Sequence, residues 1–564
     1  MNKLFQTKFW WIFLLLFLFV INFFASRIHY RFDLTKEKRY TLSNATKNLL
    51  RSLDDEVSID VFLKGDFPAG FKKLANSTEE FLRALKDRNG AKVSYRFISP
   101  EDEVEGTGIK YGDTLVGLGA NPINLSVQIK GGQQQKYIFP VALITYKGKQ
   151  KLVKLYEGGN RISQVETNNA EAMLEYQFAK GLDELTTGAK PLIAYSSGNG
   201  EVTDARNYDL SQTLQRDYEL LMFDINKQPV IPDTFKVLIV VKPSIRFTED
   251  EKLKIDQFVM RGGNLLFFID GLFAEQDSLR YKTEIVAYDR NLNLEDILFR
   301  YGIRINPDLV MDLQCDFLPF VVGGTPQNPQ YEFLRWNYYP VFEPKNNHVI
   351  NKNLGLVAGR FVNSIDTIRV SGINKTVLLS SSPNSRTIST PALISLNENR
   401  NTPEDAAYNK SNIPVAVLLE GSFPSLYRNR ISKVQSDSLA RMGFPFRESA
   451  TNSKIIVAAD GDLVLNDVSP KDGPLPMGLN LFTIGSKYEY QFANKQFLLN
   501  CIESLTDKPG IIETRNKDIV LRLLDTKKID EQRTTWQFIN IVLPVILIIL
   551  FGIIYQQIRR RKYA

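Results

Sequence analysis

Three short segments carry the polar side chains that could do chemistry in this sequence. Each of them follows a short apolar run that is typical of a buried strand. Ligands of open α/β sheets bind beyond the carboxyl ends of the parallel strands, so all three segments are candidate binding loops. The candidate residues are Gly198, Asn199, Gly200, Glu201, Glu420, Asp460 and Asp462.

Two kinds of chemistry follow from these residue types. The paired carboxylates Asp460 and Asp462 could bind Ca²⁺ or Mg²⁺, which prefer oxygen ligands, and an ordinary turn is the alternative because the other ligands of an EF-hand loop are missing. Residues 198–201 are either a binding loop or a glycine-rich turn, and the segment at Glu420 has the same alternative. A hydrolase that uses Glu201 and Asp460 as its carboxylate pair is a third hypothesis for the whole chain.

The residue types that most catalytic mechanisms need are scarce. There are 2 histidines and 2 cysteines, which excludes a zinc site built from three or four such ligands. The sequence contains neither a G-x-S-x-G elbow after a strand nor a G-x-x-x-x-G-K-[ST] loop, so it cannot hydrolyse ATP through a P-loop. We expect no catalytic residue, no metal and no cofactor. The net charge of +7 is too small for this length to indicate binding to nucleic acid.

The two cysteines, Cys315 and Cys501, allow two interpretations. They could form one disulfide in an oxidising compartment, or each could be a buried apolar thiol. Cys501 lies in the apolar run 497–502, which favours the buried thiol.

The elements expected in the first third of the chain alternate between strands and helices. Ser43 has the residue type of a helix N-cap, and residues 165–185 are expected to form a helical connector. Strand, helix, strand and then a meander predict a small α/β domain that is similar to a thioredoxin-like fold. No C-x-x-C motif is present, so thiol redox chemistry is excluded. The expected strands are 57–63, 93–98, 137–139, 142–146 and 151–155, and the helix between the first two is 71–88.

A second domain is expected to begin at Pro191. Its apolar runs are continuous, as in strands buried on both faces, and helices alternate with them, which predicts a mostly parallel, doubly wound sheet. Thr248 and Glu251 form a capping-box pattern for one of these helices. The expected strands are 192–196, 237–241, 265–269, 376–379, 415–419 and 455–459, and residues 492–505 are expected to be helical.

Residues 275–450 show little periodicity. Glycine and proline at positions 323, 324, 326 and 329 predict a long loop there. The polar stretches 400–413 and 430–453 are also expected to be irregular.

Two uncharged runs, residues 9–25 and 538–555, reach the lower limit of about 17–25 residues that a membrane-spanning helix needs. A cleaved signal peptide is the alternative for the first run, but its end lacks a clear A-x-A site. The basic cluster after the second run predicts a cytoplasmic C-terminus, and two spans then place both termini in the cytoplasm and the large domain in the periplasm. The cluster is Arg559, Arg560, Arg561 and Lys562.

A series of motifs resembles one known family, the gliding-motility-associated ABC-transporter auxiliary proteins of the GldG type in Bacteroidetes. The matching segments run in order over nearly the whole chain. They are 31–43 (RFDLTKEKRYTLS), 198–201 (GNGE), 242–243 (KP), 262–263 (GG), 336–340 (WNYYP), 419–423 (LEGSF) with Tyr427 and Arg430, 460–462 (DGD) and 521–525 (LRLLD). Relatives often carry Gly-His-Gly-Glu where this chain has Asn199, which removes an imidazole from the segment.

The resemblance implies a non-catalytic accessory subunit, often labelled substrate-binding, that works in gliding with a separate permease and a separate cytoplasmic ATPase. It also implies a glutamine-amidotransferase-like central domain without the catalytic residues, as suggested for an intraflagellar-transport protein. The alternative function is an envelope scaffold of the gliding machinery that transports nothing. The expected division is 1–30 (cytoplasmic tip and first span), 31–160 (thioredoxin-like domain), 161–190 (connector), 191–510 (amidotransferase-like domain), 511–537 (juxtamembrane segment) and 538–564 (second span and basic tail).

Overall fold

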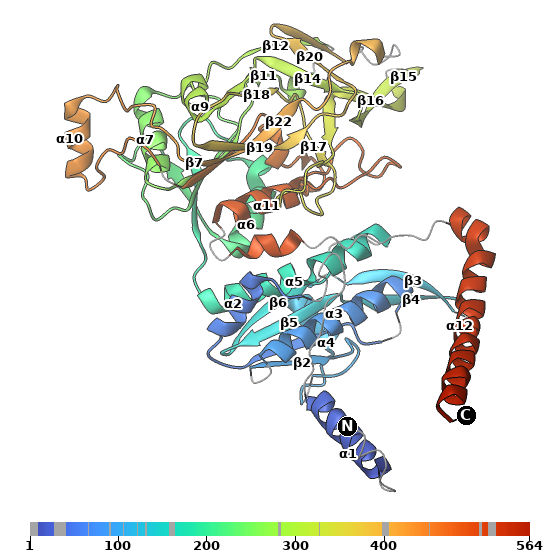
Figure 1. Ribbon diagram of the computed structural model, residues 1–564. Helices are drawn as coiled ribbons and strands as arrows, with labels where there is room; N and C mark the ends of the chain where they lie inside the picture. Colours follow the sequence, from blue (N-terminus) through green and yellow to red (C-terminus); the bar gives the residue numbers. More distant parts are fainter. Residues whose placement is uncertain are drawn as a thin grey trace.

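The described part of the chain forms two lobes and two terminal helices (Figure 1). The N-terminal lobe comprises residues 41–187 and the central lobe residues 191–506. The computed structural model describes residues 10–27, 41–65, 67–89, 92–104, 106–120, 122–129, 132–156, 164–279, 282, 284–325, 327–396, 405–450, 452–506, 510–516 and 526–563.

The N-terminal lobe is built on a four-stranded sheet of order β2-β1-β5-β6. β1 and β2 are parallel, and β5 and β6 continue the sheet in antiparallel pairs. Val57, Ile59 and Val61 of β1 are fully buried, as their alternation predicts. The strands are β1 (Val57–Val61), β2 (Val93–Phe97), β5 (Val141–Tyr146) and β6 (Lys149–Lys154), with a separate hairpin of β3 (Ile123–Ile129) and β4 (Gly132–Ile138). The helices are α2 (Asn44–Ser52), α3 (Ala69–Arg88), α4 (Tyr111–Gly117) and α5 (Gln164–Thr187).

The central lobe is built on a seven-stranded sheet of order β19-β22-β23-β10-β9-β7-β8. The five strands from β23 to β8 are parallel, whereas β22 and β19 are antiparallel. The strands are β7 (Leu192–Ser197), β8 (Glu219–Asp224), β9 (Val237–Val241), β10 (Asn264–Phe268), β19 (Ile373–Ser380), β22 (Pro414–Gly421) and β23 (Ser453–Ala458). The expected mostly parallel, helix-covered sheet is therefore confirmed.

Both faces of this sheet are buried, which explains the continuous apolar runs. Alternate residues of β9 and β10 point to opposite faces and join two separate cores. The helices α7 (Glu249–Met260) and α9 (Glu295–Tyr301) pack on one face. The helices α6 (Tyr208–Asp217) and α11 (Asn494–Thr506) pack on the other. Thr248 and Glu251 form the expected capping box at the start of α7.

The region 275–450 is more regular than predicted. The proposed loop around Gly323, Gly324 and Pro329 is instead a long hairpin of β15 (Cys315–Thr325) and β16 (Asn328–Phe342), while Pro326 lies outside the described residues. Cross-strand pairing over this length outweighs the turn preference of glycine and proline. The polar stretch 430–453 contains α10 (Lys433–Arg441), which begins with a capping box at Ser432.

Several short elements complete the described part of the chain. The strands are β11 (Leu272–Phe273), β12 (Glu284–Asp289), β13 (Ile303–Ile305), β14 (Asp308–Asp312), β17 (Val357–Ala358), β18 (Ile365–Thr367), β20 (Ser385–Ser389), β21 (Ala392–Ser395), β24 (Val468–Ser469) and β25 (Gly473–Pro474). The short helices are α8 (Gln276–Leu279), η2 (Ala205–Asn207), η4 (Asp405–Ala407), η5 (Asp462–Val464) and η6 (Ile511–Asn516).

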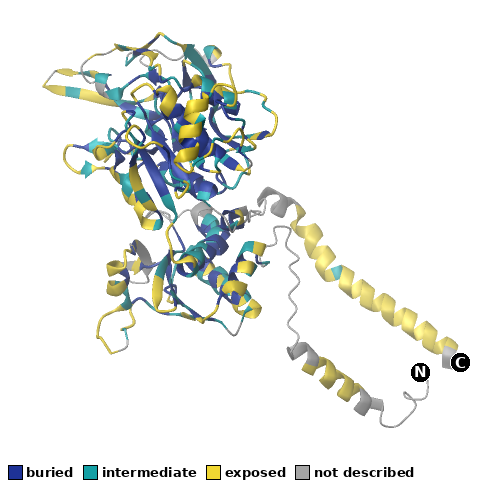
Figure 2. Cartoon of the chain, turned by 90° about the vertical axis from the view of Figure 1, so that its left-hand side faces the viewer, coloured by how far each residue is buried: buried dark blue, intermediate teal, exposed yellow. Residues whose placement is uncertain are grey.

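The two terminal helices are α1 (Trp10–Arg27) and α12 (Thr526–Tyr563). Among the described residues, the stretch 532–561 of α12 is long and apolar enough to cross a membrane, whereas the apolar part of α1 that can be judged is Leu14–Phe23. In Figure 2 the described parts of both helices are coloured almost entirely as exposed, as expected of surfaces that would face lipid. Arg559, Arg560 and Arg561 are exposed near the end of α12, and the side chain of Lys562 lies outside the described residues.

Candidate functional site

The carboxyl edge of the central sheet brings most of the predicted site residues together. Residues 198–201 follow β7, and residues 460–462 follow the parallel strand β23, so both loops lie at this edge. Glu420 lies at the opposite edge, because β22 runs antiparallel to β23 and Glu420 pairs with Lys454 at the start of that strand. The chain order changes direction between β7 and β9, which makes this the sheet's topological switch point.

The loop 198–201 is fixed by its own hydrogen bonds. The Asn199 side chain donates to Glu251 Oε2 (2.9 Å), and the Asn199 amide donates to Glu201 Oε2 (2.8 Å). Gly200 has φ +73°, and a Cβ there would lie 2.2 Å from Ser244 Oγ, so this position requires glycine. Burial raises the pKa of Glu201 above its ordinary value. The loop ties β7 to the amino end of α7.

A buried ion cluster lies next to this loop. Lys242 follows β9, and its Nζ contacts Asp270 Oδ2 (3.2 Å), Glu275 Oε2 (3.1 Å) and Asp462 Oδ1 (2.8 Å). The Lys242 side chain is 5% exposed. A Cβ on Gly461 would lie 2.6 Å from Lys242 Cβ, so the glycine lets the Lys242 side chain lie close against the turn that carries Asp462. We call Lys242, Asp270, Glu275 and Asp462 the lysine cluster.

The electrostatics of the lysine cluster keep its amine charged. Burial alone would lower the pKa of Lys242, but the charges of Asp270, Asp462 and Glu275 outweigh it and raise that pKa above its ordinary value. An amine acts as a nucleophile only when its pKa is lowered enough to free the lone pair. The backbone at Lys242 is also in the left-handed region, with φ +49°, a strained conformation that the surrounding contacts hold in place.

Asp460 is held by backbone amides and does not contact the ammonium directly. Its Oδ2 accepts from the Arg360 amide (2.8 Å), and its Oδ1 accepts from the Asp462 amide (2.7 Å). Burial, together with the charges of Asp462 and Asp270, raises the pKa of Asp460 well above its ordinary value. Asp460 therefore shapes the turn that presents Asp462 to Lys242.

Lys242 occupies the place where a divalent cation could bind at residues 460–462. Its ammonium bonds both carboxylate oxygens of Asp462 at 2.8 Å, which is the position a metal ion would need. No group of three or more potential metal ligands occurs among the residues that the structure describes. Adding millimolar Ca²⁺ or Mg²⁺ should therefore leave the thermal unfolding midpoint of the chain unchanged. A rise in the midpoint with either ion, compared with an equal ionic strength of NaCl, would contradict this assignment.

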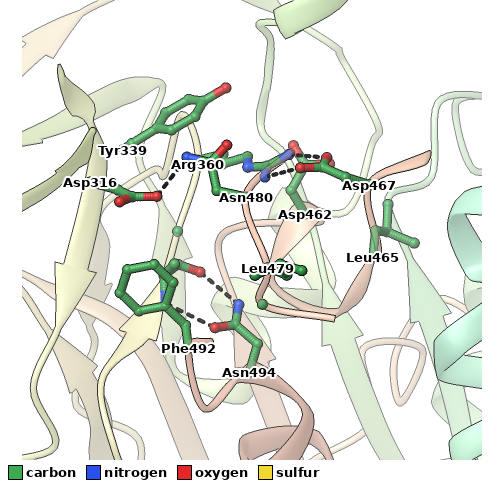
Figure 3. Close-up of a pocket in the computed structure, with 13 residues that line it drawn as sticks. Asp316, Tyr339, Arg360, Asp462, Leu465, Asp467, Leu479, Asn480, Phe492 and Asn494 are labelled. Carbon is green, nitrogen blue, oxygen red and sulfur yellow. Dashed lines mark hydrogen bonds and ion pairs between the residues drawn. The ribbon is translucent and has the colours of Figure 1, made fainter. Parts of the chain in front are cut away.

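A small cavity opens beside the cluster (Figure 3). Arg360 and Asp467 form a bidentate ion pair in its wall, with both N–O distances at 2.7 Å. Asn480 donates to Asp316 (2.7 Å) on another side. The cavity volume is ≈ 20 Å³, which is enough for roughly one water molecule. In this conformation it cannot enclose a metabolite.

Sequence reasoning missed Lys242 and Asp270 as partners, although a signal was present. Three neighbouring parallel strands, β9, β10 and β23, are each followed within two residues by a charge: Lys242, Asp270 and Asp460. One positive and two negative charges at one sheet edge indicate an ion cluster. The members contributed by distant loops, such as Glu275, carry no such signal.

The loop that follows the motif at 419–423, and that contains Tyr427, has a structural role. Asp256 of α7 is fully buried and accepts from Ser425 Oγ (2.6 Å), the Leu426 amide (2.9 Å) and Tyr301 Oη (3.0 Å). Tyr427 Oη donates to the Glu249 carbonyl (2.8 Å). These bonds dock the loop after β22 onto α7.

Both cysteines are free and buried, which confirms the thiol interpretation. Burial raises the pKa of Cys315 to about 12 and that of Cys501 well above its ordinary value, so neither thiol is reactive at neutral pH.

Comparisons with known proteins agree with a two-part chain. A family model described as an ABC-type uncharacterized transport system matches residues 190–501, and a model described as a domain of unknown function matches residues 36–145. An uncharacterized protein of Borreliella burgdorferi is 22% identical over 416 residues, which cover 72% of this chain and 75% of the relative.

Two solved structures align weakly. The mmIFT52 N-terminal domain has 14% identity and a TM-score of 0.30, over 56% of this chain and 98% of that chain. The exo-beta-1,4-mannosidase Op5Man5 from Opitutaceae bacterium strain TAV5 has 10% identity and a TM-score of 0.19, over 75% of this chain and 51% of that chain. Both TM-scores are too low to relate function.

Proposed function

The chain belongs to the family of ABC-type transport systems whose model spans residues 190–501, and on this premise we propose that it is a non-catalytic, membrane-anchored accessory subunit. Its two lobes would lie outside the cytoplasm, and the chain would bind or couple to a separate permease and a separate cytoplasmic ATPase, with the membrane helices carrying motion from these partners to the lobes. The observation that carries the proposal is the family match over the central lobe together with α12, a helix long enough to cross a membrane.

The geometry of the sheet edge supports a coupling role over a catalytic one. Lys242 is held charged by three carboxylates, and the neighbouring cavity holds about one water. In the pair that a hydrolase would use, Glu201 accepts from the Asn199 amide, and Asp460 accepts from the amides of Asp462 and Arg360. If the chain were a hydrolase that uses this pair, Glu201→Gln and Asp460→Asn would each abolish its function. We expect both variants to retain the function of the chain.

We propose a two-pass topology in the inner membrane, with α1 and α12 as the spans and both termini cytoplasmic. The uncharged, exposed stretch 14–23 of α1 and the arginines near the end of α12 support it. In the same proposal, the N-terminal lobe is a thioredoxin-like domain and the central lobe an amidotransferase-like domain. Gliding motility is the process we propose for the complex, supported by the motif series at residues 31–43, 198–201 and 419–423.

Affinity purification of the full chain from its native membrane in mild detergent, followed by mass spectrometry, tests the proposal. We expect a polytopic permease and a P-loop ATPase to co-purify in stoichiometric amounts. The same purification from cells that carry the chain without the affinity tag provides the background control. Recovery of envelope proteins without either transporter component would replace the proposal with the scaffold alternative, and ATPase activity in the chain alone would contradict it.

A further inference from the structure

The segment that leads toward α12 is clamped between the two lobes. Residues 510–516 follow α11 and pack against α2 and α5 of the N-terminal lobe. Ile511 is 4% exposed and belongs to the same core as Leu49 and Leu50 of α2. We call residues 510–516 the strap.

Arg515 pins the strap to both lobes. Its guanidinium is 1% exposed and lies 5.0 Å from the centre of the Tyr176 ring on α5. It also donates to the carbonyl of Lys352 (3.3 Å) and to the side chain of Asn500 on α11, both in the central lobe. A buried guanidinium with these partners is costly to withdraw, because each partner would lose its charged donor.

The amino end of α2 is held by the residue next to Tyr176 on the same helix. Glu175 Oε1 accepts from the Ser43 amide (2.7 Å) and from Thr46 Oγ1 (2.7 Å) at the amino end of α2. Glu175 is 2% exposed. The chain arriving from α1 and the chain leaving for α12 therefore converge on Glu175 and Tyr176.

The same helix also carries the contact between the lobes. Tyr176 Oη donates to Glu503 of α11, and Lys180 pairs with Asp217 of α6 (3.1 Å). Lys151 of β6 reaches the same aspartate (3.3 Å). Over residues 175–180, α5 is thus bonded to the start of α2, to the strap and to the central lobe.

We propose that α5 is a transmission helix that couples the two membrane-proximal ends of the chain to each other and to the lobe interface. Displacing the start of α2 loosens the strap, and withdrawing the strap loosens α2 and the contact with α11. The proposal rests on the proposed function only for the source of the displacement, which would be movement of α1 or α12 with the partner subunits.

Amide hydrogen exchange, measured by mass spectrometry on the full chain in lipid nanodiscs without partners, tests this coupling. Glu175→Met removes the acceptor for Ser43 and Thr46, and Arg515→Met removes the pin while keeping the packing. We expect Glu175→Met to speed exchange in residues 510–516, and Arg515→Met to speed exchange in residues 44–52, by about tenfold or more. Exchange in β9 should stay unchanged in both.

Two conservative variants keep the test decisive. Tyr176→Phe deletes one oxygen and preserves the ring under Arg515. It is expected to speed exchange in both segments, and it serves as the test if the larger changes prevent folding. Tyr195→Phe, which removes a buried hydroxyl bonded to the Val202 carbonyl (2.5 Å) in the central lobe, is the matched control and should change neither segment.

Faster exchange only in the segment that was mutated, or equal changes in the Tyr195→Phe control, would overturn the coupling. Because no partner is present, this result is independent of whether a permease and an ATPase co-purify. Failed co-purification with intact coupling would instead count against the proposed function alone.

Discussion

Replacing Lys242 by methionine is expected to lower the free energy of unfolding by roughly 3–5 kcal/mol. The change keeps most of the side-chain volume but removes the ammonium that Asp270, Glu275 and Asp462 share. Asp270 is 4% exposed, so its charge would be left in a poorly solvated place, with only the more distant Arg290 guanidinium (3.7 Å) and the Gly461 amide against it among the described residues. Breaking one side of a buried ion cluster costs far more than the net value of the intact cluster.

Urea unfolding followed by tryptophan fluorescence measures this change in the full chain in detergent. Trp336 is fully buried in the central lobe, whereas Trp10, Trp11 and Trp536 lie in the terminal helices. Lys227→Met is the matched control, because Lys227 forms a single exposed pair with Asp224 and should cost less than about 1 kcal/mol. Adding Asp462→Asn to Lys242→Met should recover part of the loss. A Lys242→Met chain as stable as the Lys227→Met control would refute the stabilising role of Lys242 in the lysine cluster.

Replacing Asp256 by leucine should have an effect of similar size, roughly 3–5 kcal/mol. The hydroxyls of Tyr301 and Ser425 and the Leu426 amide all donate to this carboxylate, and each would be left buried without its acceptor. Burial raises the pKa of Asp256, while the hydrogen bonds from Ser425, Leu426, Gln257 and Tyr301 counteract the shift. The carboxyl group is thus retained in the core for its hydrogen bonds.

The loop after β22 should detach from α7 in this variant. Limited proteolysis within residues 428–447 is expected to accelerate together with the loss of stability. Asp250→Leu, on the same helix but with a 68% exposed carboxylate, is the control and should leave both measurements close to wild type. Equal proteolysis of the two variants would show that Asp256 does not hold the loop.

The parts of the fold that sequence predicts are those that local chemistry determines. β9 is a run of five buried residues, and a strand covered by helices on both faces has no polar alternative. α7 begins at a capping box whose two hydrogen bonds involve residues three apart. The hairpin of β15 and β16 was predicted as a loop because its stability comes from pairing across the strands and from a buried cluster around Trp336, which single-residue preferences do not contain.

In the candidate site, too, the sequence predicts the positions of the loops but not the contacts between distant residues. The glycines and carboxylates of residues 198–201 and 460–462 could be placed at strand ends from sequence, and the structure brings both loops to one edge. Their chemistry could not be predicted, because it depends on Lys242, whose ammonium bonds Asp462 from 220 residues away. Glu420 was grouped with them only because it also follows an apolar run, and the antiparallel direction of β22 sends it to the other edge.

The position of the strap also sets an order of assembly. Ile511 completes a hydrophobic core whose other members, including Leu49 and Leu50, are synthesised several hundred residues earlier. Contacts of such long sequence separation form late, because the intervening chain must first be closed into a loop. The N-terminal lobe therefore waits for the last part of the chain before it reaches full stability, and a nascent or truncated chain that stops before residue 510 exposes an apolar seam that a chaperone would recognise.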